Sequence, residues 1–330
     1  MPPPPTRKKG KKLPHPAIRP LLLWLRQANY WLIAQGAMAV MALLRRLPAD
    51  RALDFADRAA RRIGPWFGRH RTALDNLRRA YPDKPEAEIA EIASDMWGNM
   101  ARLAAEYLFL DQLFDYDPEG RRPGRIEVTG IENFQEMAGE TDRPHIIFTG
   151  HLGNFELLPV AAATFGMNVT ALFRPPNNPY IARYILSTRR SAMGGLLPSG
   201  RGSALALGAI LAQGGNIGVL VDQKFDDGVF TTFFGRPCVT NPLVPILARR
   251  YDAAVYPARC IRLPGNRYRL EIGGRLELAR QPNGEIDVQA VAQQLTDVVE
   301  GWVREHPGQW MWFHKRWRQG RKPFPPGMVS

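Results

Sequence analysis

The stretch HIIFTGHLGNFELLPVAAA, residues 145–163, places His151 between two glycines and Glu156 five positions later. The HIIF run is typical of a buried strand, and the following apolar run is typical of a helix whose first turn Asn154 can cap. Residues five apart on one helix point about 140° apart, so we expect His151 in the turn, with Glu156 reaching back to the imidazole. A carboxylate on one ring nitrogen fixes the tautomer and makes the other nitrogen a better base. The spacing therefore predicts His151 as the general base for a hydroxyl and Glu156 as its orienting partner; an ordinary polar turn is the alternative.

The sequence lacks the patterns of a covalent or metal-dependent mechanism. It contains no GxSxG, HExxH or P-loop motif, and its six histidines have no metal-ligand spacing. Neither Cys238 nor Cys260 stands where a helix start would activate a thiol, so both are expected to pack in the interior and to stay reduced. We therefore expect no acyl-enzyme, no metal and no cofactor.

An acid-free stretch follows the candidate base. Residues 157–221 contain no Asp or Glu but five arginines, at positions 174, 183, 189, 190 and 201, which fits an anionic substrate. Arg174 follows the strand-like run VTALF, at the end where α/β sheets usually bind ligands. Arg201 lies in a Gly/Ser loop before a helix, whose backbone amides are candidate phosphate donors. A surface salt bridge and ordinary turn chemistry are the respective alternatives.

Two patterns must position these residues. From Arg51 to Phe114 apolar residues recur at helical spacing, which predicts a helical N-terminal section. After it, short β-rich runs alternate with helical segments, the runs being RIEVTG, HIIFTG, NVTALFR, NIGVLVDQ, AAVYPARCIR and RYRLEIGG. This alternation predicts an α/β fold with a mixed, largely parallel sheet flanked by helices and an antiparallel edge.

The net charge of +13 is concentrated at the two ends. Nine bases and no acid precede Asp50, and five bases and no acid follow Glu305. Among the N-terminal bases lies an uncharged run, residues 27–44, which as a helix would be about 27 Å long. Basic segments around an apolar helix indicate a protein held on an anionic membrane, with the helix embedded in the bilayer or shallowly crossing it. A core helix of a soluble domain is the alternative.

These patterns divide the chain into four sections. We expect a basic, Pro-rich disordered tail at 1–20, a membrane-associated apolar helix at 21–46, a helical section at 47–120 and an α/β catalytic section at 121–330. Residues 47–330 are expected to form one compact domain.

Several segments together resemble the late acyltransferases of lipid A biosynthesis, the lauroyl and myristoyl acyltransferases. They are HLGNFE, which fits an H-x-x-x-x-[D/E] motif, LFRP at 172–175, LLPSGRGSAL at 196–205, GVLVDQKFDDGVFTTFFGRP at 218–237 and QWMWFHKRWR at 309–318. The resemblance covers nearly the whole chain, including the N-terminal apolar helix and NLRRAYP at 76–82. Ala101, where many relatives carry glycine, and the long tail depart from the pattern, so the subfamily stays open.

The resemblance implies a glycerolipid-acyltransferase-like fold and a direct acyl transfer without cofactor. The donor would be the thioester of acyl carrier protein, and the acceptor a hydroxyacyl hydroxyl of a phosphorylated glucosamine-disaccharide lipid, with His151 as base and Glu156 as its partner. Backbone amides near Gly153 and Asn154, with Arg174 nearby, would stabilise the tetrahedral oxyanion. Asp222, Gln223 and Lys224 would end the GVLVDQ strand beside the site and position the substrate or the turn, with a polar strand end as the alternative.

The implied location is the inner membrane, with the catalytic section on the cytoplasmic face, where acidic acyl carrier protein and anionic lipid are both present. The segment WMWFHKRW, with His314, is expected at the membrane interface, with lipid-phosphate contact and core packing as alternatives. A lysophospholipid or other glycerolipid or aminolipid O-acyltransferase is the alternative enzyme. A basic membrane- or nucleic-acid-binding protein is the non-enzyme alternative, but no RNA-binding pattern supports a nucleic-acid partner.

Overall fold

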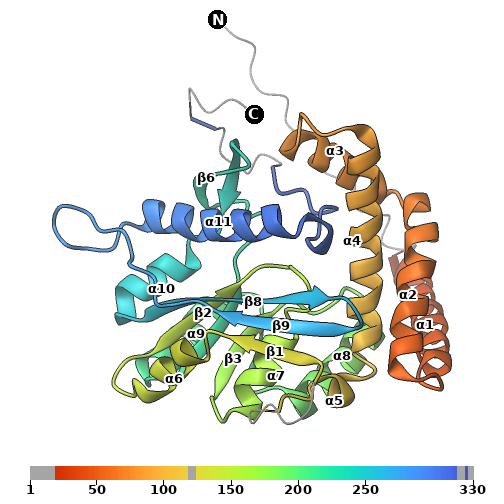
Figure 1. Cartoon of the computed structure of the whole chain (residues 1–330), viewed down its shortest axis with the longest axis horizontal. Coiled ribbons are helices and arrows are strands. Elements are labelled where there is room, and N and C mark those ends of the chain that lie inside the picture. Colours follow the sequence, from red (N-terminus) through yellow and green to blue (C-terminus); the bar gives the residue numbers. More distant parts are fainter. Residues whose placement is uncertain (1–18, 118–123, 318–323, 326–330) are drawn as a thin grey trace, which may run out of the picture.

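A seven-stranded mixed sheet forms the centre of the computed structural model, which describes residues 19–117, 124–317 and 324–325 (Figure 1). The strand order is β1-β9-β8-β2-β5-β3-β4. Strands β8, β2, β5, β3 and β4 are parallel, whereas β9 pairs antiparallel with β8 and carries β1 at the sheet edge. The strands are β1 Ile126–Thr129, β2 His145–Thr149, β3 Val169–Phe173, β4 Leu196–Pro198, β5 Asn216–Leu220, β8 Ala254–Leu263 and β9 Arg267–Ile272. The predicted α/β fold with an antiparallel edge is confirmed.

Helices cover both faces of the sheet. Alternate residues of β2 point to opposite faces, so Ile146 and Phe148 pack with α9, α10 and α11, whereas Ile147 packs near α6 and α7. Figure 1 shows α11 and α7 on opposite sides of the sheet. These helices are α6 Ile131–Gly139, α7 Leu157–Thr164, α8 Pro179–Ala192, α9 Ser203–Ala212, α10 Leu243–Tyr251 and α11 Val288–Glu305. A hairpin, β6 Val229–Phe233 with β7 Arg236–Thr240, packs against α11.

The N-terminal section is helical, as the periodicity predicts. It contains α1 Arg19–Leu44, α2 Ala49–Ile63, the short η1 Gly64–Trp66, α3 Arg69–Ala80, α4 Glu86–Glu106 and α5 Leu110–Leu113. Helix α4 packs along α2 and against η2, Pro307–Gln309, near the other end of the chain. Helices α3 and α4 thereby join the large core that includes α11 and the sheet.

Helix α1 confirms the predicted N-terminal helix, with bounds shifted by two residues at each end. Most of its apolar side chains are exposed, including Leu21 to Leu25, Trp31 and Leu32. In the described part of the chain, no helix combines the length and apolarity needed to cross a membrane, so crossing, one of the two expected arrangements, is not supported. The predicted tail falls almost wholly on residues 1–18, outside the described residues.

Candidate active site

His151 and Asp222 meet at the carboxyl edge of the parallel strands. Strands β2 and β5 are neighbours with Thr149 opposite Leu220, so the residues two positions beyond each strand emerge side by side. The His151 ring Nδ1 lies 2.7 Å from Asp222 Oδ1, and the His151 backbone amide donates to Oδ2 at 2.7 Å. The indole N–H of Trp310 also donates to Oδ2, at 2.8 Å. Asp222 therefore accepts hydrogen bonds from both the backbone and the ring of His151.

The buried carboxyl of Asp222 is held in its charged form. Burial alone would raise its pKa, but the nearby His151 charge and the hydrogen bonds from the His151 ring, the His151 amide and the Trp310 indole outweigh it, so the pKa lies below its ordinary value. Because Nδ1 faces an ionised carboxylate, Nδ1 carries the proton and Nε2 is left as the basic nitrogen.

Gln223 forms a hydrogen bond with the basic nitrogen of His151. Its side-chain Nε2 lies 3.0 Å from His151 Nε2 and donates to it. The amide N–H thus stands where a substrate hydroxyl would stand before losing its proton. Asp222 and Gln223 fall beside His151, as predicted for the end of this strand; Lys224 instead forms an ion pair with Asp226 in the following loop.

Glu156 does not pair with His151, contrary to the expected geometry. It immediately precedes α7 and lies 5% exposed, and its carboxylate pairs with Arg189 of α8. Arg189 also donates to the Tyr107 hydroxyl at 2.8 Å. Burial would lower the pKa of Arg189, but the charges and hydrogen bonds of Glu156 and Tyr107 outweigh it and raise that pKa. The adjacent strand, not the helix that follows the turn, supplies the partner of His151.

The turn after His151 is shaped by Gly153 and Asn154. Gly153 has a φ of +55°, and a Cβ there would lie 2.0 Å from the Cys260 carbonyl oxygen, so glycine is required. Asn154 is fully buried, and its Oδ1 accepts from the Glu156 amide at 3.2 Å, which stabilises the turn before α7.

One of the backbone amides expected to stabilise an oxyanion is already engaged. The Gly153 amide donates to the Gln309 carbonyl at 3.1 Å. Two buried side-chain donors near this turn lack a hydrogen-bond partner among the described residues, Asn154 Nδ2 and Arg189 Nε. These two side chains are therefore candidate donors in addition to the predicted amide of Asn154.

Arg174 and Arg201 lie at the same sheet edge but apart from the histidine pair. Arg174 follows β3 and Arg201 follows β4, two neighbouring parallel strands, and both side chains are exposed. Three of the five loop amides expected to bind phosphate make internal bonds: Ser199 to the Phe173 carbonyl, Ser203 to the Gly200 carbonyl, and Gly200 to the Ser203 hydroxyl. The two arginine side chains and the amides of Arg201 and Gly202 are the remaining candidate donors to an anion. The Arg190 side chain lies outside the described residues.

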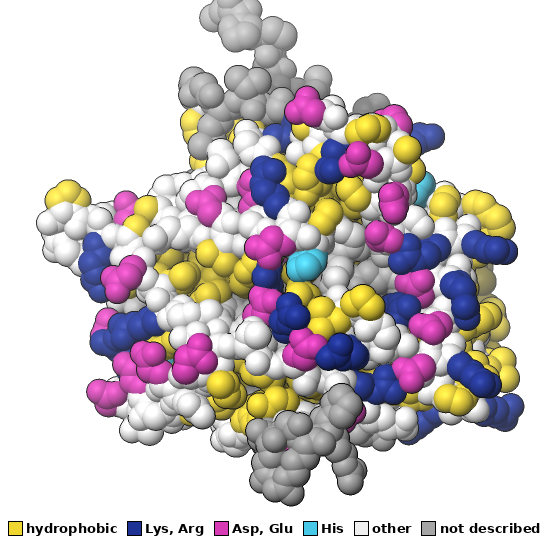
Figure 2. Space-filling view, viewed as in Figure 1, with side chains coloured by type: hydrophobic (Ala, Val, Ile, Leu, Met, Phe, Trp, Pro, Cys, Tyr) yellow, Lys and Arg dark blue, Asp and Glu magenta, His cyan; other side chains and the backbone are white. Residues whose placement is uncertain are grey.

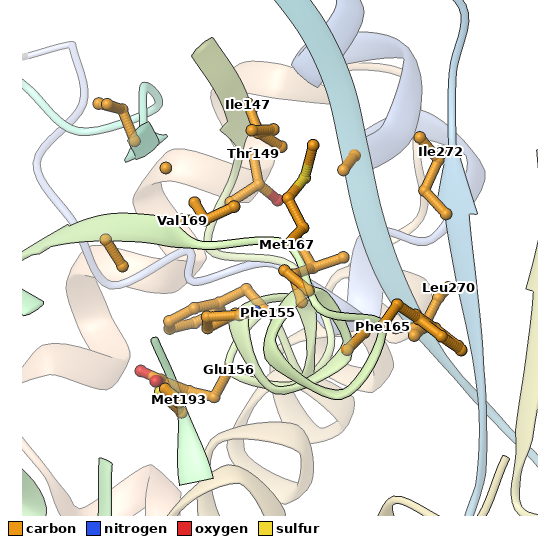
Figure 3. Close-up of a pocket in the computed structure, with 18 of the residues that line it drawn as sticks. Ile147, Thr149, Phe155, Glu156, Phe165, Met167, Val169, Met193, Leu270 and Ile272 are labelled. Atoms are coloured by element: carbon orange, nitrogen blue, oxygen red, sulfur yellow. The ribbon is translucent and has the colours of Figure 1, made fainter. Parts of the chain in front are cut away.

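An apolar cavity opens beside the histidine pair, between the sheet and the α6–α7 face. Its atom-free space, including the open mouth, is about 1020 Å³. Its lining follows β3 from Val169 through Ala171 to Phe173, about 13 Å of strand. Figure 3 shows apolar side chains of β2, β3 and β9 converging on this space, with Phe155 and Glu156 among its walls. The Phe155 ring, which lines the cavity, lies 5.1 Å from the His151 ring, centroid to centroid, so this ring stands between the cavity and the candidate base.

The C-terminal segment packs in the core next to the site and does not form the expected membrane interface. Trp310, Trp312 and Trp317 are buried in the core, so core packing, the alternative, holds. Asn76 of α3 donates to the carbonyls of Trp312 and His314 at 2.7 Å each, which fixes the segment that carries the Trp310 indole to Asp222. Spacing in the sequence could not reveal this contact, because Trp310 and Asp222 lie 88 positions apart.

His314 is an unused titratable group close to the site. Its Nδ1 is buried without a hydrogen-bond partner among the described residues. Burial lowers its pKa to about 4, with the charges of Asp222 and His151 as further influences. Within residues 19–117, 124–317 and 324–325, no three His, Cys, Asp or Glu side chains are grouped as a metal site requires. Both cysteines are buried thiols, as expected.

Comparison with known proteins identifies the family of this chain. Residues 18–319 match the family described as bacterial lipid A biosynthesis acyltransferase. The chain is 26% identical over 305 residues to the lipid A biosynthesis myristoyltransferase of Escherichia coli (strain K12), covering 90% of each chain. Lipid A biosynthesis acyltransferase 1 of Shigella flexneri is also 26% identical over 305 residues, with 90% of each chain covered. The chain belongs to the bacterial lipid A biosynthesis acyltransferase family and is an acyltransferase.

Proposed function

We propose that this enzyme transfers a fatty acyl chain from an acyl carrier protein thioester to a hydroxyl on an acyl chain of a phosphorylated glucosamine-disaccharide lipid. The observation that carries the proposal is the His151–Asp222 pair next to Phe155, a wall of an apolar cavity. A basic nitrogen beside a channel for hydrocarbon is what acyl transfer to an alcohol needs. Family membership supplies the lipid A context.

His151 acts as the base in a direct transfer. The acceptor hydroxyl displaces the Gln223 amide from His151 Nε2 and gives its proton to that nitrogen as its oxygen attacks the thioester carbonyl. The tetrahedral intermediate then collapses, the C–S bond breaks, and the thiolate takes the proton from the imidazolium. The Asp222 carboxylate holds Nδ1–H and stabilises the imidazolium between these two proton transfers.

Arg189 is the proposed donor to the oxyanion. It lines the cavity, it is cationic, and its buried Nε–H has no partner among the described residues. Glu156 and Tyr107 fix the other end of the guanidinium, so the free N–H keeps a set direction. One preorganised oxyanion donor contributes about 10²- to 10³-fold. In this proposal Glu156 positions Arg189 rather than the base.

The apolar cavity holds the acyl chain of the donor. Its lining includes Phe155 and Glu156, which follow the carboxyl end of β2, and Met137 and Met167, of which Met167 precedes β3 at the opposite end of the strands. A chain that binds with its carbonyl near His151 would place its methyl end near the two methionines. The exposed Arg174 and Arg201 lie at the same sheet edge, where the phosphates of the acceptor would meet them.

The proposed location is the inner membrane, with the catalytic section facing the cytoplasm. Acyl carrier protein is cytosolic and acidic, and the basic segments of this chain fit the anionic inner leaflet. In intact spheroplasts, an engineered cysteine at the exposed Ile246 should resist a membrane-impermeant reagent until the membrane is broken. Labelling before lysis would contradict both the orientation and the donor.

Mass spectrometry of lipid A from cells with and without the gene tests the acceptor. The proposal predicts that the gene adds one ester-linked acyl chain to the disaccharide lipid. Purified protein should also use the acyl carrier protein thioester in preference to the coenzyme A thioester. Unchanged lipid A alongside an altered phospholipid or aminolipid profile would instead support the alternative acceptors.

A further inference from the structure

We propose that the turn at Ile63, Pro65, Trp66 and Phe67, here called the Trp66 tip, is a second membrane contact that inserts into an anionic bilayer. The sequence predicts membrane attachment through the apolar segment that forms α1, and this contact lies in a different segment. It does not depend on the acyl-transfer chemistry, because bilayer binding can be measured without substrates.

The tip exposes a contiguous apolar surface. Trp66 is 84% exposed and Phe67 is 54% exposed, and the neighbouring Ile63 and Pro65 are exposed as well. Single exposed apolar side chains are ordinary on protein surfaces, but four in one turn mark a binding surface. Tryptophan is favoured at the membrane–water interface, where its ring is apolar and its N–H stays hydrated.

The turn is held rigidly, so the exposure is built into the fold. A Cβ on Gly64 would lie 2.3 Å from the Trp97 ring of α4, so the backbone of the turn sits directly on that ring. The Phe67 ring lies 5.6 Å from the Trp97 ring, which in turn stacks on Phe313. The Trp97 indole N–H donates to the His70 ring at 3.1 Å. These contacts fix the turn while leaving Trp66 pointing away from the body.

The charge around the tip complements an anionic surface. Residues 58–74 contain five arginines and no Asp or Glu. On α2, Arg51, Phe55, Arg58 and Arg62 are all exposed and follow one helical face toward the tip. None of these three arginines forms an ion pair with another described residue. Figure 2 shows basic and hydrophobic side chains alternating along the edge where Figure 1 places α1 and α2.

A bilayer fits these features better than acyl carrier protein does. Both partners would attract arginine, but a convex tip led by an exposed tryptophan matches the interface of a membrane, where apolar and basic side chains bind together. The arginines would lie at the level of the lipid phosphates, with the aromatic rings between the head groups.

A fluorophore at position 66 tests the insertion directly. The full-length Trp66→Cys variant would carry a polarity-sensitive dye; Cys238 and Cys260 are buried, which leaves the new thiol as the accessible one. The matched control is Ile246→Cys on α10, which is 41% exposed. With vesicles of phosphatidylcholine and phosphatidylglycerol, the dye at 66 should shift to the blue and brighten, whereas the dye at 246 should not change.

An unchanged dye at position 66 on protein that sediments with these vesicles would overturn the proposal. A shift produced by acyl carrier protein and not by vesicles would also overturn it, in favour of a protein partner. As a second measurement, Trp66→Ser with Phe67→Ser should weaken vesicle binding about tenfold or more, and Ile246→Ser should leave it unchanged. Acyl transfer in detergent micelles should be the same in both variants, which separates failure of this contact from failure of the proposed chemistry.

Discussion

Replacement of Asp222 by Asn should remove the base while leaving the shape of the site intact. In the native enzyme, Asp222 Oδ2 accepts from the His151 amide and the Trp310 indole, and Oδ1 accepts from Nδ1. An asparagine that keeps the first two bonds must turn its NH₂ toward Nδ1 and donate to it. The imidazole then carries its proton on Nε2 and can no longer accept one from the substrate.

The expected loss in kcat is the general-base contribution, roughly 10²- to 10⁴-fold. Glu156→Gln is the matched comparison, since it is also an isosteric carboxylate-to-amide change near the same turn. It weakens the hold on Arg189 but leaves the tautomer of His151 unchanged. Its transfer rate should fall as an oxyanion donor is misplaced, while the pH dependence of the rate keeps the wild-type form.

The assay is the transfer rate from acyl carrier protein thioester across the pH range, with thermal unfolding as the control for folding. Asp222→Asn with a kcat near that of wild type would refute the orienting role of Asp222. A Glu156→Gln variant that reproduces the pH profile of His151→Ala would return that role to Glu156, as the sequence spacing suggests.

Other residues give further predictions. Gly218 lines the cavity, and an added Cβ there would meet ordinary contacts at 3.5 Å or more. Gly218→Ala and then Gly218→Leu should shorten the preferred acyl chain stepwise in a donor competition assay. An unchanged preference would place the acyl chain elsewhere. Gln223→Ala should lower KM for the acceptor with little change in kcat, since the acceptor no longer has to displace the amide from His151 Nε2; a raised KM would contradict this. Burial lowers the pKa of His314 from 6.5 to about 4, so as pH falls the unfolded chain binds a proton at this residue before the folded protein does. The free energy of unfolding should therefore decrease by up to about 3 kcal/mol between pH 6.5 and pH 4. The free energy of unfolding of His314→Gln, measured in urea, should fall less steeply with decreasing pH than that of wild type. An identical pH dependence would exclude His314 as the cause.

Local patterns predicted the elements well because they depend on neighbouring residues. All six β-rich runs are strands, and the helices before, between and after them follow their apolar spacing. The strand β4 and the β6–β7 hairpin had no such prediction, since LLP is too short for a pattern and the hairpin sits among polar turn residues. Their positions are set by pairing and by packing against α11.

The sequence predicted which residues lie in the candidate site but not which of them contact each other. His151, Asp222 and Gln223 were expected near one another because the family resemblance implies that the GVLVDQ strand ends beside the histidine, and the pairing of β2 with β5 brings them together. Which carboxylate contacts His151 depends on strand order, and local sequence patterns do not reveal that β2 and β5 are neighbours. The spacing of five residues therefore favoured Glu156, whose true partner, Arg189, lies 33 positions away on another helix.

Mass spectrometry of the acceptor, after reaction with purified wild type or His151→Ala, tests the central claim most directly. The reaction contains an acyl carrier protein thioester and a phosphorylated glucosamine-disaccharide lipid with hydroxyacyl chains, in a preparation free of host acyltransferase. The account predicts that wild type adds one acyl chain to a hydroxyacyl hydroxyl and that His151→Ala, although folded, adds almost none. Transfer by His151→Ala at the wild-type rate would contradict the account.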